Sequence, residues 1–135
     1  MDIHSNVEAA LPLDLSTAFG EWHEDLQALQ GKVQLAVCCN VIHITPWSIA
    51  QGLFNGVSQL LKPGGTFALY GPFIEDGQYS SDGNRSFDAM LRLRNPEWGL
   101  RELRRVEDLA NGVALTLNEN IAMPANNLLL LFQRQ

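Results

Sequence analysis

Two polar residues near the middle of the chain are of types that bind small molecules and transfer protons. Asn40 and His43 stand in the string CCNVIHIT, at the end of an apolar run from Val33 to Ile44. An asparagine amide donates and accepts hydrogen bonds, and a neutral histidine accepts a proton near pH 7. His43 is therefore a candidate general base beside a candidate ligand-binding residue, Asn40. A histidine in this place also serves as a hydrogen-bonded structural residue, and the residues alone leave both roles open.

Three aromatic residues extend this candidate site. Tyr70 and Phe73 end the next apolar run, and Trp47 begins the segment between the two runs. If the runs are neighbouring strands, Tyr70 lies on the same rim as Asn40 and His43 and is a second candidate catalytic residue. Phe73 and Trp47 are candidates for substrate contacts. The alternative is that all three rings pack against the core.

The stretch from Val33 to Phe73 would position these residues, because it reads as strand, helix and strand. Its first run is rich in β-branched residues, as in strands that are covered on both faces. Thr45 offers an N-cap hydroxyl, and Pro46 fits the first helical position. The helix that follows has one apolar stripe, made of Ile49, Ala50, Leu53, Phe54, Val57, Leu60 and Leu61. A Pro-Gly-Gly stop and a strand at 66–70 complete a right-handed βαβ unit of a parallel sheet.

The rest of the chain supplies further elements of an α/β fold. Apolar spacing and turn residues predict a strand at 7–15, a helix at 21–29, a polar loop with two Asp-Gly pairs at 74–84, helices at 84–94 and 100–111, and strands at 113–123 and 127–133. A tight turn joins the last two strands into an antiparallel hairpin at the edge of the sheet. We expect residues 1–135 to form one partial domain with four segments, at 1–32, 33–73, 74–112 and 113–135.

Composition and charge narrow the function. The 135 residues carry a net charge of −6, whereas nucleic-acid binding needs a basic face, so we expect no nucleic-acid partner. No apolar run is long enough to span a membrane, and no zinc-ligand spacing, P-loop or nucleophile elbow occurs. The adjacent Cys38 and Cys39 would point to opposite faces of a strand. Such free thiols suit a reducing cytoplasm. Because the two thiols point apart and no zinc-ligand spacing occurs, we expect no metal. Because no run could span a membrane, we expect no membrane partner.

Several strings resemble one known family. LKPGG before a buried strand is similar to the segment after the fourth strand of class I S-adenosylmethionine (SAM)-dependent methyltransferases. From about Val7 to the C-terminus the chain resembles the C-terminal half of the methyltransferase-like 26 (DUF938) family, through NVIHITPW, GLFNGV, LKPGGTFALYGPF, SFDAMLRLRNPEWGLRELRRVEDL and MPANNLLLLF. The resemblance implies a truncated class I methyltransferase fold, with a Rossmann-like mixed sheet and a C-terminal antiparallel hairpin. It also implies SAM as the cofactor and a small molecule as the methyl acceptor.

The chain departs from this family in the part that holds the cofactor. The family begins with a strand and a glycine-rich loop for the methionine part of SAM, and a second strand ends in an acid for the ribose. Glycines let the backbone approach such a ligand, and no G-x-G pattern occurs in this chain. The resemblance starts at the family's third strand, so we expect half of the cofactor site to be absent. The expected function is a methyltransferase-fold protein that is inactive alone or depends on a partner. The alternatives are a non-catalytic binding or assembly protein and a gene fragment.

The resemblance also assigns roles to individual residues. Asp14 matches the acid after the family's third strand, which commonly faces the adenine amino group, and an ordinary turn aspartate is the alternative. Asn40, from its place at the strand end, would bond to a substrate or to the amino-acid end of the cofactor. Arg101 and Asn126 stand in strings that resemble the family and are candidates for substrate contacts. For Asn126, holding the hairpin turn is the favoured alternative.

The same resemblance predicts a bare sheet edge. In the family's usual strand order, 3-2-1-4-5-7-6, the run at 33–44 is strand 4, and removing strands 1 and 2 exposes its edge. That run is too apolar to face water. Either residues 7–15 pair with it or a second molecule covers it. We expect a homodimer, with an extended sheet or an exchanged N-terminal segment.

Overall fold

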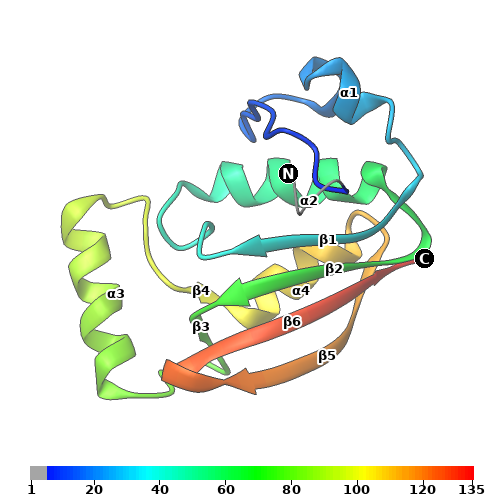
Figure 1. Cartoon of the computed structure of the whole chain (residues 1–135). Coiled ribbons are helices and arrows are strands. Elements are labelled where there is room, and N and C mark those ends of the chain that lie inside the picture. Colours follow the sequence, from blue (N-terminus) through cyan, green and yellow to red (C-terminus); the bar gives the residue numbers. More distant parts are fainter. Residues whose placement is uncertain (1–5) are drawn as a thin grey trace.

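The computed structural model describes residues 6–135, and its elements confirm the predicted alternation of strands and helices (Figure 1). In chain order they are η1 (Phe19–Glu21), α1 (Glu24–Gln27), β1 (Val33–Cys39), α2 (Trp47–Leu60), β2 (Leu61–Gly71), β3 (Phe73–Ile74), α3 (Asp82–Arg94), β4 (Arg101–Glu102), α4 (Leu103–Asn111), β5 (Leu115–Met123), η2 (Pro124–Asn126) and β6 (Asn127–Arg134). None of the helices in the described residues is long and apolar enough to cross a membrane.

Four strands form one mixed sheet in the order β1-β2-β6-β5. β1 and β2 are parallel and α2 connects them, which confirms the predicted strand-helix-strand unit. β6 is antiparallel to both β2 and β5, so the C-terminal hairpin is also confirmed. This order matches the 4-5-7-6 part of the expected methyltransferase order. β3 and β4 form a separate two-stranded parallel sheet.

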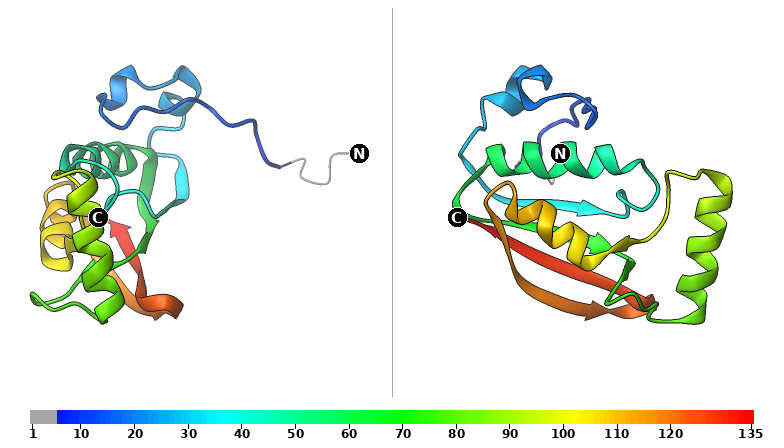
Figure 2. Two further views of the ribbon diagram at one scale, coloured as in Figure 1. Left: turned by 90° about the vertical axis from the view of Figure 1, so that its left-hand side faces the viewer. Right: turned by 180° about the vertical axis from the view of Figure 1, so that it is seen from behind.

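Helices α2 and α4 cover one face of the four-stranded sheet (Figure 2). The stripe predicted for α2 supplies four residues that are at most 6% exposed: Ala50, Leu53, Phe54 and Val57. At the centre of this core, the ring of Phe54 meets those of Phe67 and Phe132 edge to face, at centroid distances of 5.2 and 5.3 Å. Burial of such a side chain contributes about 1.5–3 kcal/mol, so this helix-covered face is the main source of stability.

The opposite face of the sheet carries no helix from residues 6–135, as the left panel of Figure 2 shows. We call it the helix-free face, and its residues on β1 and in the middle of β2 and β6 are Leu35, Val37, Cys39, Ala68, Tyr70, Leu129 and Leu131. Thr66, Gln133, Thr116, Glu119 and Ile121 lie on the same face, the last three of them on β5. The strand register makes apolar rows across it, because Val37 lies opposite Ala68 and Ala68 opposite Leu131. Leu35 and Val37 are 57% and 61% exposed. This face is therefore apolar and exposed at β1, and it becomes more polar towards β5.

The N-terminal segment does not pair with β1. Residues 7–15 form no strand, so the predicted strand at this place is wrong. The segment packs on α2 instead: the carbonyl of Leu15 lies against Gly52, and the Trp22 ring lies against Gly56, where neither site has room for a Cβ. Pro12, which lacks an N–H, also disfavours strand pairing. The edge of β1 is thus unpaired within the described residues.

The loop after β1 differs from the prediction. β1 ends at Cys39, because Asn40 has a φ of +58° and turns the chain out of the strand. Thr45 is not the N-cap of α2, since its hydroxyl donates to the carbonyl of Val41 and Pro46 takes the N-cap position. The loop at 40–46 consequently stands at the carboxyl ends of β1 and β2, where it carries the candidate base.

Three further boundaries are corrected. The helix predicted at 21–29 is reduced to the four residues of α1, after the short turn η1. Asp82-Gly83 begins α3 rather than a turn, because the Ser81 hydroxyl accepts a bond from an N–H of the first helical turn. The helix predicted at 100–111 starts later, at the first residue of α4, because Arg101–Glu102 pairs with β3.

Candidate functional site

Two of the predicted residues meet at the carboxyl ends of β1 and β2. The backbone N–H of Asn40 donates to the carbonyl of Tyr70 at 2.9 Å, which ties the loop at 40–46 to β2. A Cβ placed on Gly71 would lie 3.6 Å from Oδ1 of Asn40 and 3.7 Å from Nδ1 of His43. Asn40 and His43 therefore converge on the end of β2, at the edge where parallel α/β sheets bind their ligands.

His43 is held in a buried position. Its side chain is 5% exposed and its ring lies edge-on to Phe87 of α3, with centroids 5.8 Å apart. Its backbone carbonyl accepts a hydrogen bond of 3.0 Å from the N–H of Gly99. Burial lowers the pKa of His43, and the positive charge of Arg101 lowers it further. The imidazole is consequently neutral at pH 7, which is the form that accepts a proton.

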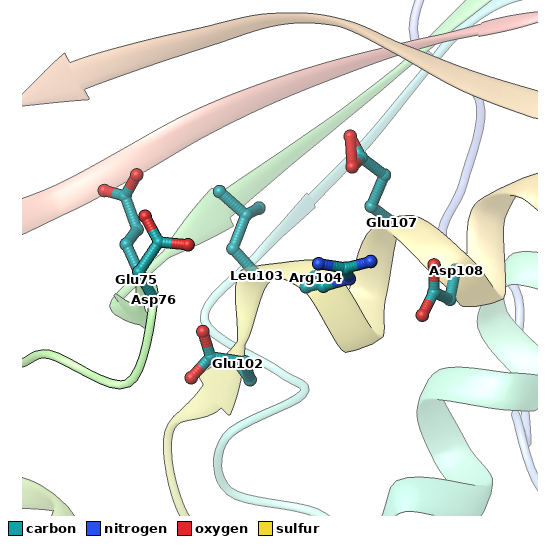
Figure 3. Close-up of a pocket in the computed structure, with 7 residues that line it drawn as sticks. All are labelled: Glu75, Asp76, Glu102, Leu103, Arg104, Glu107 and Asp108. Carbon is teal, nitrogen blue, oxygen red and sulfur yellow. The ribbon is translucent and has the colours of Figure 1, made fainter.

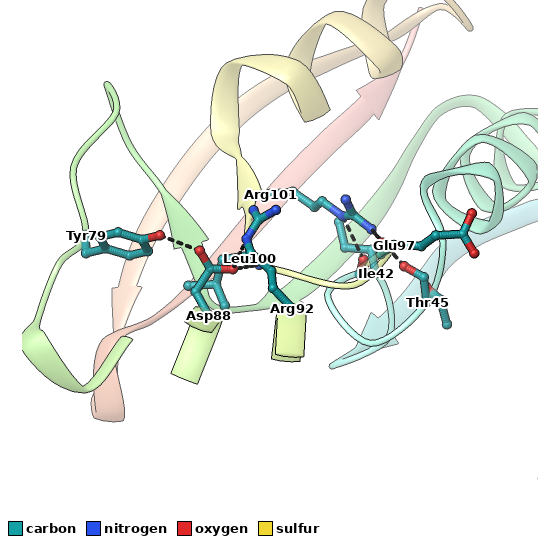
Figure 4. Close-up of polar contacts among 8 residues, drawn as sticks. All are labelled: Ile42, Thr45, Tyr79, Asp88, Arg92, Glu97, Leu100 and Arg101. Carbon is teal, nitrogen blue, oxygen red and sulfur yellow. Dashed lines mark hydrogen bonds and ion pairs between the residues drawn. The ribbon is translucent and has the colours of Figure 1, made fainter. Parts of the chain in front are cut away.

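Arg101 holds the loop that carries His43 (Figure 4). Its Nε donates to the carbonyl of Ile42 at 3.1 Å, and its Nη2 donates to the carbonyls of Thr45 and Glu97 at 2.7 and 2.8 Å. The guanidinium lies over the ring of Trp47, 5.6 Å from its centroid. Two predicted substrate contacts, Arg101 and Trp47, thus lie together beneath the loop, where Arg101 is 8% exposed.

A buried carboxylate that the sequence reasoning did not single out lies behind this loop. Asp88 of α3 is 2% exposed, and its Oδ1 accepts from the N–H of Leu100 at 2.8 Å and from Nε of Arg92 at 3.1 Å. The hydroxyl of Tyr79 donates to its other oxygen, and this bond is the main reason that the pKa of Tyr79 is raised. The helical spacing of Asp88 and Leu91 was the available signal that Asp88 faces inward.

Tyr70 points away from His43. Successive side chains of a strand alternate, so Tyr70 lies on the helix-free face, whereas the Cβ direction of Gly71 leads to His43. The hydroxyl of Tyr70 accepts a 3.0 Å bond from Nδ2 of Asn127. The structure therefore ties the loop that carries His43 to Tyr70 through the backbone N–H of Asn40, but it separates the two candidate catalytic side chains.

Phe73 and Asn126 line one hollow of about 190 Å³ beside the hairpin turn. The other residues lining it are Glu75, Ser80, Ala122, Met123, Asn127 and Leu128. The φ of Asn126 is +59°, and its carbonyl accepts a 3.1 Å bond from Nδ2 of Asn84 on α3. The turn is thus fixed to α3, and the hollow combines an apolar wall with amide and carboxylate groups.

Asp14 does not line the hollow that contains Phe73 and Asn126. Its exposed carboxylate accepts bonds from the hydroxyl and the N–H of Ser16, at 2.6 and 2.9 Å, and these bonds lower the pKa of Asp14. It lines a separate hollow of about 400 Å³ with Pro12, Leu13, Thr17, Glu21, Trp22 and His23. Both bonds go to Oδ1, so this oxygen is engaged in the local turn, as expected of the turn aspartate considered above.

A second rim hollow, of about 300 Å³, is acidic (Figure 3). It is lined by Glu75, Asp76, Glu102, Leu103, Arg104, Glu107 and Asp108. One Glu102 oxygen accepts the N–H of Gly77 at 3.2 Å, which fixes the turn after β3. Within residues 6–135 no three His, Cys, Asp or Glu side chains gather as metal ligands. This hollow shares no residue with the predicted site.

Comparison with known proteins agrees with the fold. A family model described as "Protein of unknown function (DUF938)" matches residues 2–134. An O-methyltransferase family protein from Burkholderia thailandensis aligns over 93% of this chain and 35% of its own, with a TM-score of 0.70 and 13% identity. Human N-acetylserotonin methyltransferase in complex with SAM aligns over 75% and 29%, with a TM-score of 0.63 and 14% identity.

A third solved structure shows the same partial match. It is a LepI variant in complex with SAH (S-adenosylhomocysteine) and a substrate analogue, and it aligns over 93% of this chain and 30% of its own, with a TM-score of 0.71 and 15% identity. These likenesses show a methyltransferase-like α/β fold. The chain spans about a third of the length of each structure it matches.

Proposed function

We propose that this chain, which belongs to the DUF938 family, supplies the acceptor side of a SAM-dependent methyltransferase site, with His43 as the general base. The observation that carries the proposal is the convergence of Oδ1 of Asn40 and Nδ1 of the buried His43 on the end of β2. Ligands of α/β folds bind at this edge of the sheet. The methyltransferase-like fold supports the same assignment.

The chemistry requires little beyond positioning and one proton acceptor. When bound, SAM supplies a methyl group on a sulfonium, and the acceptor must approach that group in line. Since neighbours of this fold include O-methyltransferases, we take an acceptor hydroxyl as the nucleophile. The neutral imidazole of His43 removes the hydroxyl proton as the oxygen gains its methyl group.

The acceptor contacts are assigned to the rim of the sheet. Phe73 and Asn126 line the hollow beside the hairpin turn, and Tyr70 lies next to it through its bond to Asn127. An aromatic wall with amide donors suits a small molecule that carries both a ring and polar groups. Trp47 reaches the same end of the sheet from the start of α2.

The residues fit only part of the cofactor. The exposed amide of Asn40 can bond to the carboxylate or ammonium of the methionine end. The two bonds from Ser16 both go to Oδ1 of Asp14, so its Oδ2 is the acceptor that we assign to the adenine amino group. The 135 residues contain no G-x-G string to approach the ligand with backbone. We therefore propose that a glycine-rich polypeptide segment beside β1 completes the site and that residues 1–135 by themselves are inactive.

A chimera tests this proposal. The part of the Burkholderia thailandensis protein that precedes the matched segment is joined to residues 7–135 of this chain, and SAH binding is measured by calorimetry. We expect micromolar binding that falls about tenfold in an Asn40→Ala variant, since a hydrogen bond to a charged group is lost. Asn118→Ala, an exposed change on β5, is the control. A folded chimera that binds no SAH would refute the proposal.

A second function is favoured by the unpaired edge of β1. Leu35 and Val37 are exposed there, and such edges pair readily with other strands. We infer that the same edge pairs with a second copy when no other polypeptide covers it, giving a homodimer with a continuous sheet. If the chimera binds no SAH while the unmodified chain is dimeric, an assembly protein is the better description.

A further inference from the structure

We propose that Arg101 is a positioning residue, which holds the loop carrying His43 through the backbone carbonyls of Ile42 and Thr45 in the geometry that proton transfer requires. The inference rests on the proposed function of His43. The sequence made Arg101 a candidate substrate contact. The structure gives it a different role, because the N–H groups of Arg101 that form hydrogen bonds donate to backbone carbonyls.

The loop at 40–46 is gripped at three successive places by one segment. Arg101 bonds to the carbonyls of Ile42 and Thr45, on either side of His43. Between these two bonds, the carbonyl of His43 itself accepts the N–H of Gly99. Loop and segment are 56 to 59 residues apart in the chain, so these contacts are long-range ones. His43 therefore has little freedom to move relative to β4.

The gripping segment is itself anchored to α3. The N–H of Leu100, next to Arg101, donates to Asp88, and Asp88 also bonds to Arg92 and Tyr79. Asp88 is among the most buried polar residues described. A chain of bonds thus runs from the α3 carboxylate to the loop that carries the base, and Figure 4 draws its members.

The chemistry of the bonds explains why an arginine stands here. A buried guanidinium presents several N–H donors in a fixed plane, and this one uses Nε and Nη2 on three carbonyls. The ammonium of a lysine has no such planar fork and would hold fewer of these carbonyls. Within residues 6–135, Arg101 forms no ion pair with a carboxylate, so its charge remains available to act on its neighbours.

That charge reaches His43. Arg101 is the charged group that lowers the pKa of His43, and Arg101 in turn is under the influence of Arg105 of α4 and of Arg92 and Asp88 of α3. Desolvation lowers this pKa more strongly. The hydrogen bonds of Arg101 thus fix the loop that carries the imidazole, and its positive charge helps to keep the imidazole neutral.

Two variants of Arg101 separate these effects. Arg101→Lys keeps the charge and loses the fork, whereas Arg101→Met loses both, and Arg104→Met on the exposed side of α4 is the matched control. Amide hydrogen exchange is followed at Ile44 and Gly99, whose N–H groups bond within the gripped loop. The pKa of His43 is measured by NMR titration of its ring. The full chain is used without any cofactor, so a folded chimera that binds no SAH would overturn the proposed function and leave this result unaffected.

Exchange at Ile44 and Gly99 should become at least about tenfold faster in both Arg101 variants, because charge-assisted bonds are lost, and should not change in Arg104→Met. The pKa of His43 should rise clearly in Arg101→Met and less in Arg101→Lys. Unchanged exchange in the folded variants would overturn the proposal. So would a failure of both variants to fold while Arg104→Met folds, because that result would make Arg101 a residue of the whole fold rather than of one loop.

Discussion

The two faces of the four-stranded sheet are built from the same strands but meet different surroundings. On the helix-covered face, Phe67 and Phe132 are fully buried against α2 and α4. The residues next to them in the strands, Ala68 and Leu131, lie on the helix-free face in an apolar row that ends at Val37. Exposure rises along this row, because Ala68 is buried, Leu131 is partly buried and Val37 is 61% exposed. The comparison shows that the stability of the chain comes mainly from the helix-covered face, and we propose that another polypeptide covers the exposed part of the helix-free face at β1.

The largest difference between the two faces should appear in the free energy of unfolding of variants with a substitution on each face. Phe132→Ala leaves a cavity between Phe54 and Phe67 and should lower the free energy of unfolding by about 3–5 kcal/mol. Leu131→Ala removes a side chain that is only partly buried and should cost less than about 2 kcal/mol. Urea unfolding at low protein concentration measures both. Equal losses would mean that the two faces are not distinct in the monomer.

The second prediction concerns association through β1. Leu35→Lys combined with Val37→Lys places charges along the unpaired edge and should convert the expected dimer into a monomer, because the edge could no longer pair without burying them. Light scattering after size exclusion reads out the mass. Leu93→Lys, at an 89% exposed position of α3, is the control and should stay dimeric. A monomeric unmodified chain at high concentration would rule out the homodimer.

The third prediction uses the adjacent cysteines as reporters of the two faces. Cys38 packs against the core, and burial raises its pKa to about 11, whereas Cys39 is exposed on the helix-free face. At pH 8 only about one in a thousand Cys38 thiols is ionised, so a thiol reagent should label Cys39 and leave Cys38 until the chain unfolds. Mass spectrometry of peptic fragments locates the label. Simultaneous labelling of both thiols would show that β1 is not packed as described.

The smallest expected effect is a dependence of stability on pH that comes from His43. The folded-state pKa of His43 lies below its ordinary value of 6.5, so the unfolded chain binds this proton more readily. Stability should therefore fall as the pH drops below about 6.5 and level off below the folded pKa. Urea unfolding at several pH values, carried out on the unmodified chain and on His43→Gln, isolates the contribution of His43 to the free energy of unfolding. This contribution should be missing in the variant. An identical pH profile in that variant would exclude His43 as its source.

Much of the fold could be predicted because periodic apolar residues report directly on burial. The stripe around Phe54 specified α2, and the apolar runs specified β1, β2 and the hairpin. The errors arose where one local signal has two meanings. Asp82-Gly83 opens a helix because Ser81 caps it, and residues 7–15 pack on α2 because Gly52 admits the backbone of Leu15. Such close approaches depend on tertiary contacts that spacing alone does not encode.

The candidate site was predictable only in outline. The sequence placed Asn40 and His43 at a strand end, and the structure shows where they converge. The positive φ of Asn40, which ends β1 early, has no signal in an apolar run. The side chain of Tyr70 points away from His43 because β2 fixes the alternation of its residues, and the register was not known beforehand. Asp88 and the bonds of Arg101 join distant segments and could not be read from local patterns.

The central claim is that this chain forms the acceptor side of a site which another polypeptide segment completes. Calorimetric titration of the unmodified chain with SAM, with its mass recorded by light scattering, tests the claim most directly. We expect no binding heat up to millimolar ligand, because the 135 residues lack the glycine-rich backbone that holds the cofactor. Micromolar binding by the chain alone would contradict it, and would show that these residues build a complete cofactor site.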